Sequence, residues 1–310
     1  MAETAVLIAY LEASVRLGVP LALAALGETL SQRSGVINIG LEGSIIAGAL
    51  GGALGALATG SPAVGVATGA GAGLLVAAVF ALFVVVLNTD QIITGTAVTL
   101  GGLGFTAVIY QSRFGATGTA LSLPTLDVWR VPILVDLPAI GPAFFAQAPT
   151  TYLAYLLAPL FWWVLFRTEW GLEIRAAGED PEAAAAAGVR VRTLRAVMCL
   201  LAGALAGIAG AHLALAHTGT FSEGMSAGKG FIAIAVVVLG RWNPLLVLAA
   251  AMFFGAASAL QFALQTLGLD IGYQLFLAFP YVLTLAALAG WVGRSRAPAA
   301  LALPWPREDT

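Results

Sequence analysis

The chain has 310 residues, of which 60% are hydrophobic and 10% charged, with a net charge of −2 and a mean hydropathy of +0.94. A soluble domain carries about 25% charged residues, so this composition excludes a water-exposed globular protein and predicts an all-α, polytopic transmembrane helical bundle. The balance of charge gives no reason to expect nucleic acid as a partner. The single cysteine, Cys199, excludes an internal disulfide and a cysteine-built metal site.

Apolar windows of about 20 residues predict eight full membrane spans. In chain order they lie near residues 5–26, 42–60, 63–87, 92–112, 150–167, 196–217, 244–265 and 273–293. A further apolar run, "GFIAIAVVVLG" at 230–240, is too short to cross as a straight helix and is expected to be a broken half-span or a re-entrant segment. We therefore expect one transmembrane domain over residues 1–310, with eight or nine spans and one or two broken or re-entrant segments.

The stretch "RSGVINIGLEG", residues 33–43, places polar groups and glycines between the first two spans. Glycines allow the backbone to leave helical geometry. Asn38 and Glu42 are then expected to pair with the freed backbone groups or to line a water-filled cavity, because polar groups that face lipid are costly. The alternative is a plain loop in which Arg33 anchors the topology and Asn38 caps the next helix.

A second polar interruption, "NTDQIITGT", occupies residues 88–96. Asp90 is expected to cap the helix that follows. Gln91 and Thr94 remain candidates for the lining of a solute pathway.

Two long segments separate the later spans. Residues 113–149 hold five of the 14 prolines and are expected to form an external loop region, whereas residues 167–195 are rich in charge. Within the second segment "PEAAAAAG" predicts a short helix, with Asp180 as N-cap, Pro181 at the first position and Gly188 closing it. A two-turn helix is marginal in water. It is either docked on another protein or an ordinary capped linker, and local chemistry alone favours the linker.

The distribution of Arg and Lys predicts the orientation of the chain. With the N-terminus outside and residues 230–240 crossing, ten of the 14 basic residues are cytoplasmic and four are external. Because positive charge accumulates on the cytoplasmic side, we expect the N-terminus outside and the C-terminus in the cytoplasm.

Three motifs together resemble one family. "ETLSQRSGVINIGLEG" (28–43), "EIRAAGEDPEAAAAAGV" (173–189) and "AIAVVVLGRWNP" (233–244) come in the order and spacing of the membrane permeases of ATP-driven importers. The group is that of the branched-chain amino acid and ribose-type ABC permeases, with a type II importer fold, and the wording of the first motif is most similar to the nucleoside and simple-sugar branch. One departure is that residues 1–26 leave no room for the additional N-terminal span of ribose-type relatives.

The resemblance implies a permease subunit in a bacterial or archaeal plasma membrane. Its implied partners are a second permease subunit, related or identical, a cytoplasmic ABC ATPase, and an extracellular substrate-binding lipoprotein. The residues expected to contact the ATPase are Gly178, Glu179, Asp180, Pro181, Glu182, Ala185 and Gly188, and the pathway candidates are Asn38, Glu42, Gln91 and Thr94.

The same resemblance implies that the chain is not an enzyme and binds no cofactor or metal, with ATP and magnesium held by the partner ATPase. In "EGMSAGKG" (223–230) a glutamate replaces the first glycine of a phosphate-binding loop, so no ATP site is expected there. The expected solute is a nucleoside or a similar neutral molecule. The alternatives are a ribose-type sugar, or an ion-coupled secondary transporter, which would need carboxylates deep in its spans.

Overall fold

The computed structural model describes residues 2–115, 122–138, 140–266, 282 and 296–305. The long helices are α1 (Ala2–Arg33), α2 (Leu41–Thr59), α3 (Pro62–Ala81), α4 (Gln91–Phe114), α6 (Pro149–Arg167), α9 (Val191–His212) and α11 (Pro244–Thr266). The short helices are α5 (Ile140–Phe145), α7 (Glu169–Glu179), α8 (Pro181–Ala186) and α10 (Lys229–Leu239). Two π-helical turns, η1 (Leu82–Val86) and η2 (Leu213–Thr218), extend α3 and α9. A two-residue antiparallel pair joins β1 (Trp129–Arg130) to β2 (Ala146–Gln147).

Seven helices among the described residues are long and apolar enough to cross a membrane. They correspond to seven of the eight predicted spans, and the eighth, 273–293, lies outside the described residues. The predicted end of the first span at residue 26 is wrong, because α1 continues to Arg33. Thr29, Ser31 and Gln32 in this added stretch are buried, so these polar residues belong to the helix and not to a loop.

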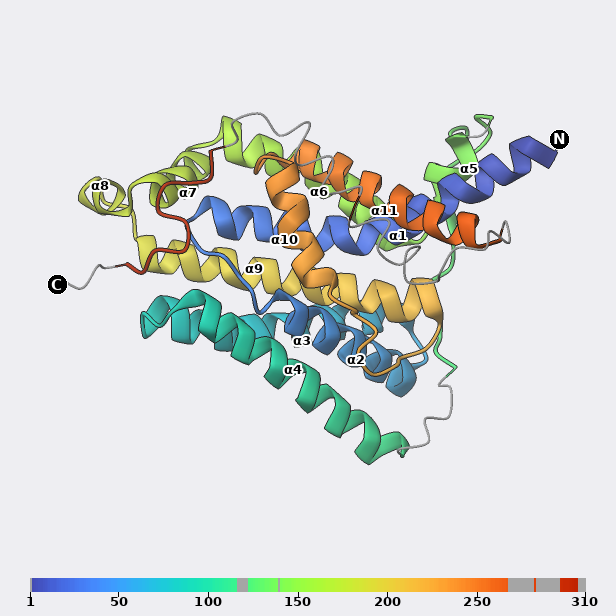
Figure 1. The fold of residues 1–310 in the computed structure, drawn as a ribbon, viewed down its shortest axis with the longest axis horizontal. Helices are drawn as coiled ribbons and strands as arrows, with labels where there is room; N and C mark the ends of the chain where they lie inside the picture. The colour runs from blue at the N-terminus through green and yellow to red at the C-terminus, as the bar shows by residue number, and fades with distance from the viewer. Residues whose placement is uncertain (1, 116–121, 139, 267–281, 283–295, 306–310) are drawn as a thin grey trace.

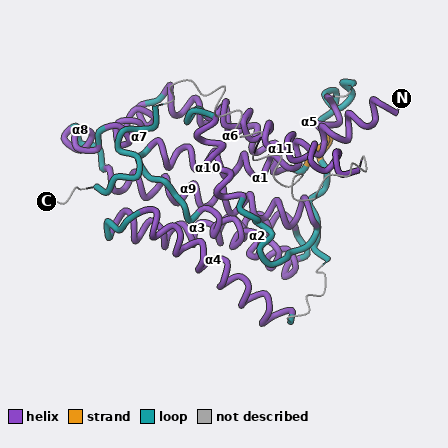
Figure 2. Tube along the Cα trace, viewed as in Figure 1, coloured by secondary structure: helices purple, strands orange, loops and turns teal. Residues whose placement is uncertain are grey.

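The bundle has two distinct ends (Figure 1). Helices α1, α9 and α11 run along its long axis, with the N-terminus at one end, and α8 with residues 296–305 at the other. We call the end that holds α8 and residues 296–305 the α8 end. Helix α10 is 11 residues long and lies across the long helices, preceded by a coil at 219–228 (Figure 2). Residues 219–240 thus form a broken segment, half coil and half helix.

Glycines bring α2, α3 and α9 into backbone contact. A Cβ added at Gly69 would lie 2.8 Å from the Gly48 carbonyl oxygen, and one at Gly203 would lie 2.8 Å from the Gly73 carbonyl oxygen. A Cβ added at Gly48 would lie closer still to the backbone of Gly207. Small residues allow such an approach between membrane helices. We refer to α2, α3 and α9 as the glycine-packed block.

Candidate functional site

Residues 34–40 form a break between α1 and α2, called here the helix break. Gly35 has a φ of +97°, a conformation that side-chain-bearing residues rarely adopt. The break leads the chain from the end of α1 past α9 to the start of α2 (Figure 1). Because it lies inside a bundle of apolar helices, each of its backbone polar groups requires a partner.

Side chains of α1 and α4 supply those partners. Gln91 Oε1 accepts from the Ile37 N–H and Glu28 Oε1 accepts from the Asn38 N–H, each at 2.9 Å. On the acceptor side, the Ser31 hydroxyl donates to the Val36 carbonyl and the Thr99 hydroxyl donates to the Ile39 carbonyl, also at 2.9 Å. The polar residues around this motif therefore stabilise a non-helical backbone within the bundle.

Glu42, in the first turn of α2, connects the helix break to α10. Its carboxylate accepts from the Gly228 N–H at 2.8 Å and from the Gly230 N–H at 2.6 Å, and Glu42 itself is 3% exposed. A Cβ at Gly230 would lie 2.7 Å from the Glu42 Cα, so the two backbones are in contact. Hydrogen bonds from N–H groups at a helix start to a carboxylate are among the stronger ones. Glu42 thus pairs with backbone groups, but with those at the start of α10 and not with those freed in its own stretch as expected.

Asn38 is fully buried, and neither its side-chain nitrogen nor its side-chain oxygen has a hydrogen-bond partner among the described residues. Helix α2 begins after Gly40, with no side-chain capping bond. The alternative in which Asn38 caps the next helix is therefore wrong. Native proteins rarely leave a buried polar group without a partner, so this amide is a feature of the helix break that packing alone does not explain.

The second polar interruption behaves as predicted at its cap. Asp90 Oδ1 accepts from the Ile92 and Ile93 N–H groups at 2.8 Å. Gln91 is buried, and its side-chain oxygen accepts from the Ile37 N–H. The Thr94 hydroxyl forms a hydrogen bond of 2.8 Å with the Thr89 hydroxyl. Thr94 also lines an apolar groove of about 610 Å³ between α3 and α4. Asn38 therefore belongs to the helix break and Gln91 is bonded to it at Ile37, whereas Thr94 lies one turn along α4.

The short helix predicted from Pro181 is present as α8 at the end of the bundle. Asp180 Oδ1 accepts from the Glu182 N–H at 3.1 Å and from the Ala183 N–H at 3.0 Å, so Asp180 is the N-cap as predicted. Among the expected ATPase contacts, Glu179, Asp180, Glu182 and Gly188 are exposed, Pro181 and Ala185 are half-buried, and Gly178 is buried. The surface of α8 is open to a partner, and Gly178 lies beneath it.

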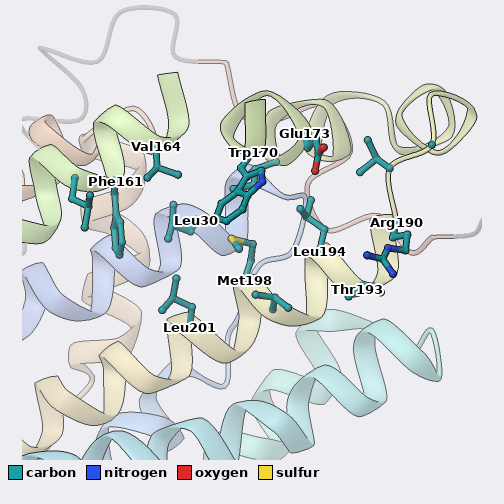
Figure 3. Close-up of a pocket in the computed structure, with 15 residues that line it drawn as sticks. Leu30, Phe161, Val164, Trp170, Glu173, Arg190, Thr193, Leu194, Met198 and Leu201 are labelled. Atoms are coloured by element: carbon teal, nitrogen blue, oxygen red, sulfur yellow. The ribbon is translucent and has the colours of Figure 1, made fainter. Parts of the chain in front are cut away.

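A cavity of about 610 Å³ lies between α7 and α9 (Figure 3). Its walls are largely apolar and include Phe161 of α6, Trp170 of α7 and Met198 of α9, whereas Glu173 and Arg190 are near its α8 side. Gly188 and Val189, which follow α8, complete the wall. The cavity separates much of this face of α7 from α9.

Two buried charged residues of the site were missed as functional candidates. Glu28 is considered in the sequence only as a carboxylate in or beside the first span that an ion-coupled transporter would use, although it accepts from both Gln32 and Asn38. Arg195 was counted as a loop charge, yet it lies in the second turn of α9 and is 4% exposed. The signal for both is a charged residue that falls inside an apolar helical stretch, where it is costly unless it is paired.

The chain is similar to known proteins over most of its length. Residues 10–288 match the family described as "Branched-chain amino acid transport system / permease component". The "Putative glucose ABC transporter permease protein TsgC13" of Haloferax volcanii is 37% identical over 96% of this chain and 97% of its own length. The "Guanosine ABC transporter permease protein NupQ" of Bacillus subtilis is 37% identical over 92% of both chains. The "Nucleoside ABC transporter permease protein NupC" of Lactococcus lactis is 34% identical over 91% of both. No solved structure matches.

Proposed function

The chain belongs to the permease component family of the branched-chain amino acid transport system, and on this premise we propose that it forms the membrane pathway for a nucleoside in an ATP-driven importer. It is a polytopic helical membrane protein and an ABC transporter permease subunit. Family membership over the full chain favours this reading over the ion-coupled secondary transporter.

The choice of solute rests on the relatives that align over nine-tenths of both chains, two of which carry guanosine or nucleoside in their names. Two carboxyl groups lie next to the helix break: Glu42 accepts from two backbone amides, and Glu28 accepts from Gln32 and the Asn38 N–H. Because both have partners within the protein, the break agrees with a neutral solute. A rearrangement of the helix break that exposes the buried Asn38 amide would offer a donor and an acceptor to the hydrogen-bonding edge of a nucleobase. A monosaccharide is the second candidate, because a relative of equal identity is named for glucose.

The partners follow from the architecture of such importers. The α8 end faces the cytoplasm and receives an ABC ATPase on α8, with the N-terminus outside and the C-terminus inside. A second permease subunit completes the pathway, and an external binding protein delivers the solute. The exposed acidic residues Glu179, Asp180 and Glu182 support the docking assignment, because they offer a charged surface to a soluble partner.

ATP binding can drive the permease only if the ATPase contacts α8 differently in its two states. Closure of the ATPase would displace α8 and thereby change the packing around the helix break. In this mechanism α8 receives the movement of the ATPase, and the break at 34–40 responds to it.

The test is uptake into proteoliposomes that contain the complete importer with its binding protein. Labelled uridine, guanosine, glucose and ribose are compared with and without internal ATP. We expect ATP-dependent uptake of a nucleoside. Good uptake of glucose or ribose without nucleoside uptake would overturn the choice of solute, and uptake by this chain without the ATPase would overturn the ATP-driven mechanism.

A further inference from the structure

Arg195 joins three separate backbone segments at the α8 end. Its Nε donates to the Ser34 carbonyl of the helix break at 3.0 Å, and its Nη2 donates to the Ala177 carbonyl of α7 at 3.3 Å. Its Nη1 donates to the Leu303 carbonyl at 3.2 Å. The planar guanidinium is suited to holding several acceptors in fixed directions, which a lysine ammonium cannot reproduce.

The helix break and α7 also touch directly beside Arg195. Gly178 is so close to the Arg33 carbonyl that a Cβ has no room there, and it would also lie 3.2 Å from the Gly35 nitrogen. A Cβ at Gly35 would in turn lie 2.5 Å from Arg195 Nη2. The end of α7, which leads into α8, is thus packed on the first residues of the break.

Residues 296–305, called here the C-terminal strap, close the same contact from outside. The Ala300 N–H donates to the Gly178 carbonyl at 2.8 Å, and the Ala302 N–H donates to the Gly35 carbonyl at 3.1 Å. The strap therefore bonds to both partners of the α7–break contact. It adds to Arg195 a second connection between the same two segments.

Elsewhere the cavity keeps much of α7 away from α9. A displacement of α7 therefore has few routes into the bundle on this side, one of them the apolar cluster of Ala177, Ala184 and Val191. Another such route is the contact formed by Arg195, Gly178, Gly35 and the strap. It ends on the backbone of the helix break at Ser34, four residues before Asn38.

We propose that Arg195 is a positioning residue that transmits movement of α7 and α8 to the helix break, so that its loss uncouples ATP hydrolysis from solute movement. The inference rests on the proposed function, because it takes α8 as the site at which the ATPase acts. It differs from a purely structural role, since coupling is expected to fall while assembly and ATP hydrolysis persist.

The experiment compares Arg195→Gln and Arg195→Lys with Arg192→Gln in the complete importer. Arg192 is an exposed residue of the same helix, so its variant controls for the loss of one charge at this end of the bundle. We measure the ATPase rate, the labelled uridine or guanosine taken up per ATP hydrolysed, and recovery of the assembled complex. Arg195→Gln is expected to lower the uptake per ATP about tenfold, within the usual range of coupling effects. Arg195→Lys is expected to lie between it and the parent, and provides the assembled variant if glutamine prevents assembly.

A second measurement is independent of the solute. Hydrogen exchange of the amides at 34–40 is followed with and without a non-hydrolysable ATP analogue. We expect a nucleotide-dependent change in the parent complex and in Arg192→Gln, and its loss in Arg195→Gln. An unchanged ratio and an unchanged exchange response in Arg195→Gln would overturn the inference, as would an equal loss in Arg192→Gln. Failure of nucleoside uptake with a normal exchange response would instead count against the proposed solute alone.

Discussion

Replacing Glu42 by glutamine should release α10 from α2. In the parent chain the carboxylate accepts two N–H bonds, from Gly228 and Gly230. Glutamine keeps one acceptor oxygen and turns its NH₂ toward the second N–H. One bond is lost and one buried donor is left without a partner.

The expected loss of stability follows from what such hydrogen bonds contribute in soluble proteins and between membrane helices. Hydrogen bonds to charged groups contribute about 1.5–3 kcal/mol in soluble proteins, whereas bonds between membrane helices reach about 1.7 kcal/mol. For Glu42→Gln we therefore expect a loss of about 2 kcal/mol in the free energy of unfolding.

The assay is unfolding in mixed micelles of mild detergent and dodecyl sulfate, followed by helical circular dichroism. Glu223→Gln is the matched control, because Glu223 accepts a single exposed bond from Gln111 at 3.0 Å. Its loss should remain within about 0.5 kcal/mol. If Glu42→Gln were no more destabilising than Glu223→Gln, the carboxylate could not be what holds the start of α10.

Three further predictions concern α8 and the glycine-packed block. Asp180→Ala removes the N-cap of α8, which costs about 1 kcal/mol, so the affinity for the ATPase should fall about fivefold in a titration with the purified ATPase. The double change Glu182→Arg with Gly188→Leu reverses an exposed charge and places a side chain at a φ of +94°. It should abolish both assembly with the ATPase and solute uptake. If assembly and uptake both survive, the docking assignment is wrong. Gly48→Ala should lower the free energy of unfolding by about 1–3 kcal/mol through overpacking. Its control is Gly71→Ala, because nothing in the described residues lies within 4 Å of a Cβ added at Gly71, and this variant should change the unfolding free energy by less than about 0.5 kcal/mol. Equal effects of the two variants would contradict the packing argument.

Local signals in the sequence were sufficient for the caps and for most spans. Asp90 and Asp180 both cap helices as predicted, because the bonds that they make lie within three residues of the cap. The short apolar run at 230–240 corresponds to α10, and its length alone was the basis for predicting a broken or re-entrant segment there.

The site itself depends on partners that are distant in the chain. The predicted first span ended before Thr29, Ser31 and Gln32, whereas these residues belong to α1 and are buried. The Ser31 hydroxyl lies 3.6 Å from the Cys199 sulfur, and Gln32 accepts from the Trp242 indole. Arg195 likewise shows its role only once residues 34, 177 and 303 lie together. Residue spacing within one helix carries no information on which carbonyls that guanidinium will reach.

The glycine contacts among α2, α3 and α9 limit how this protein can change shape. Where main chains touch without intervening side chains, no rotamer change can absorb a shift, so the three helices have to travel together as one stiff body. Any opening and closing of the pathway is then expected at the ends of that body, which include residues 34–40 and 219–228. The first stretch is held by side-chain hydroxyls, a carboxamide, a carboxylate and the Arg195 guanidinium, and the second by the Glu42 carboxylate at residue 228. These hydrogen bonds can exchange partners as the protein moves.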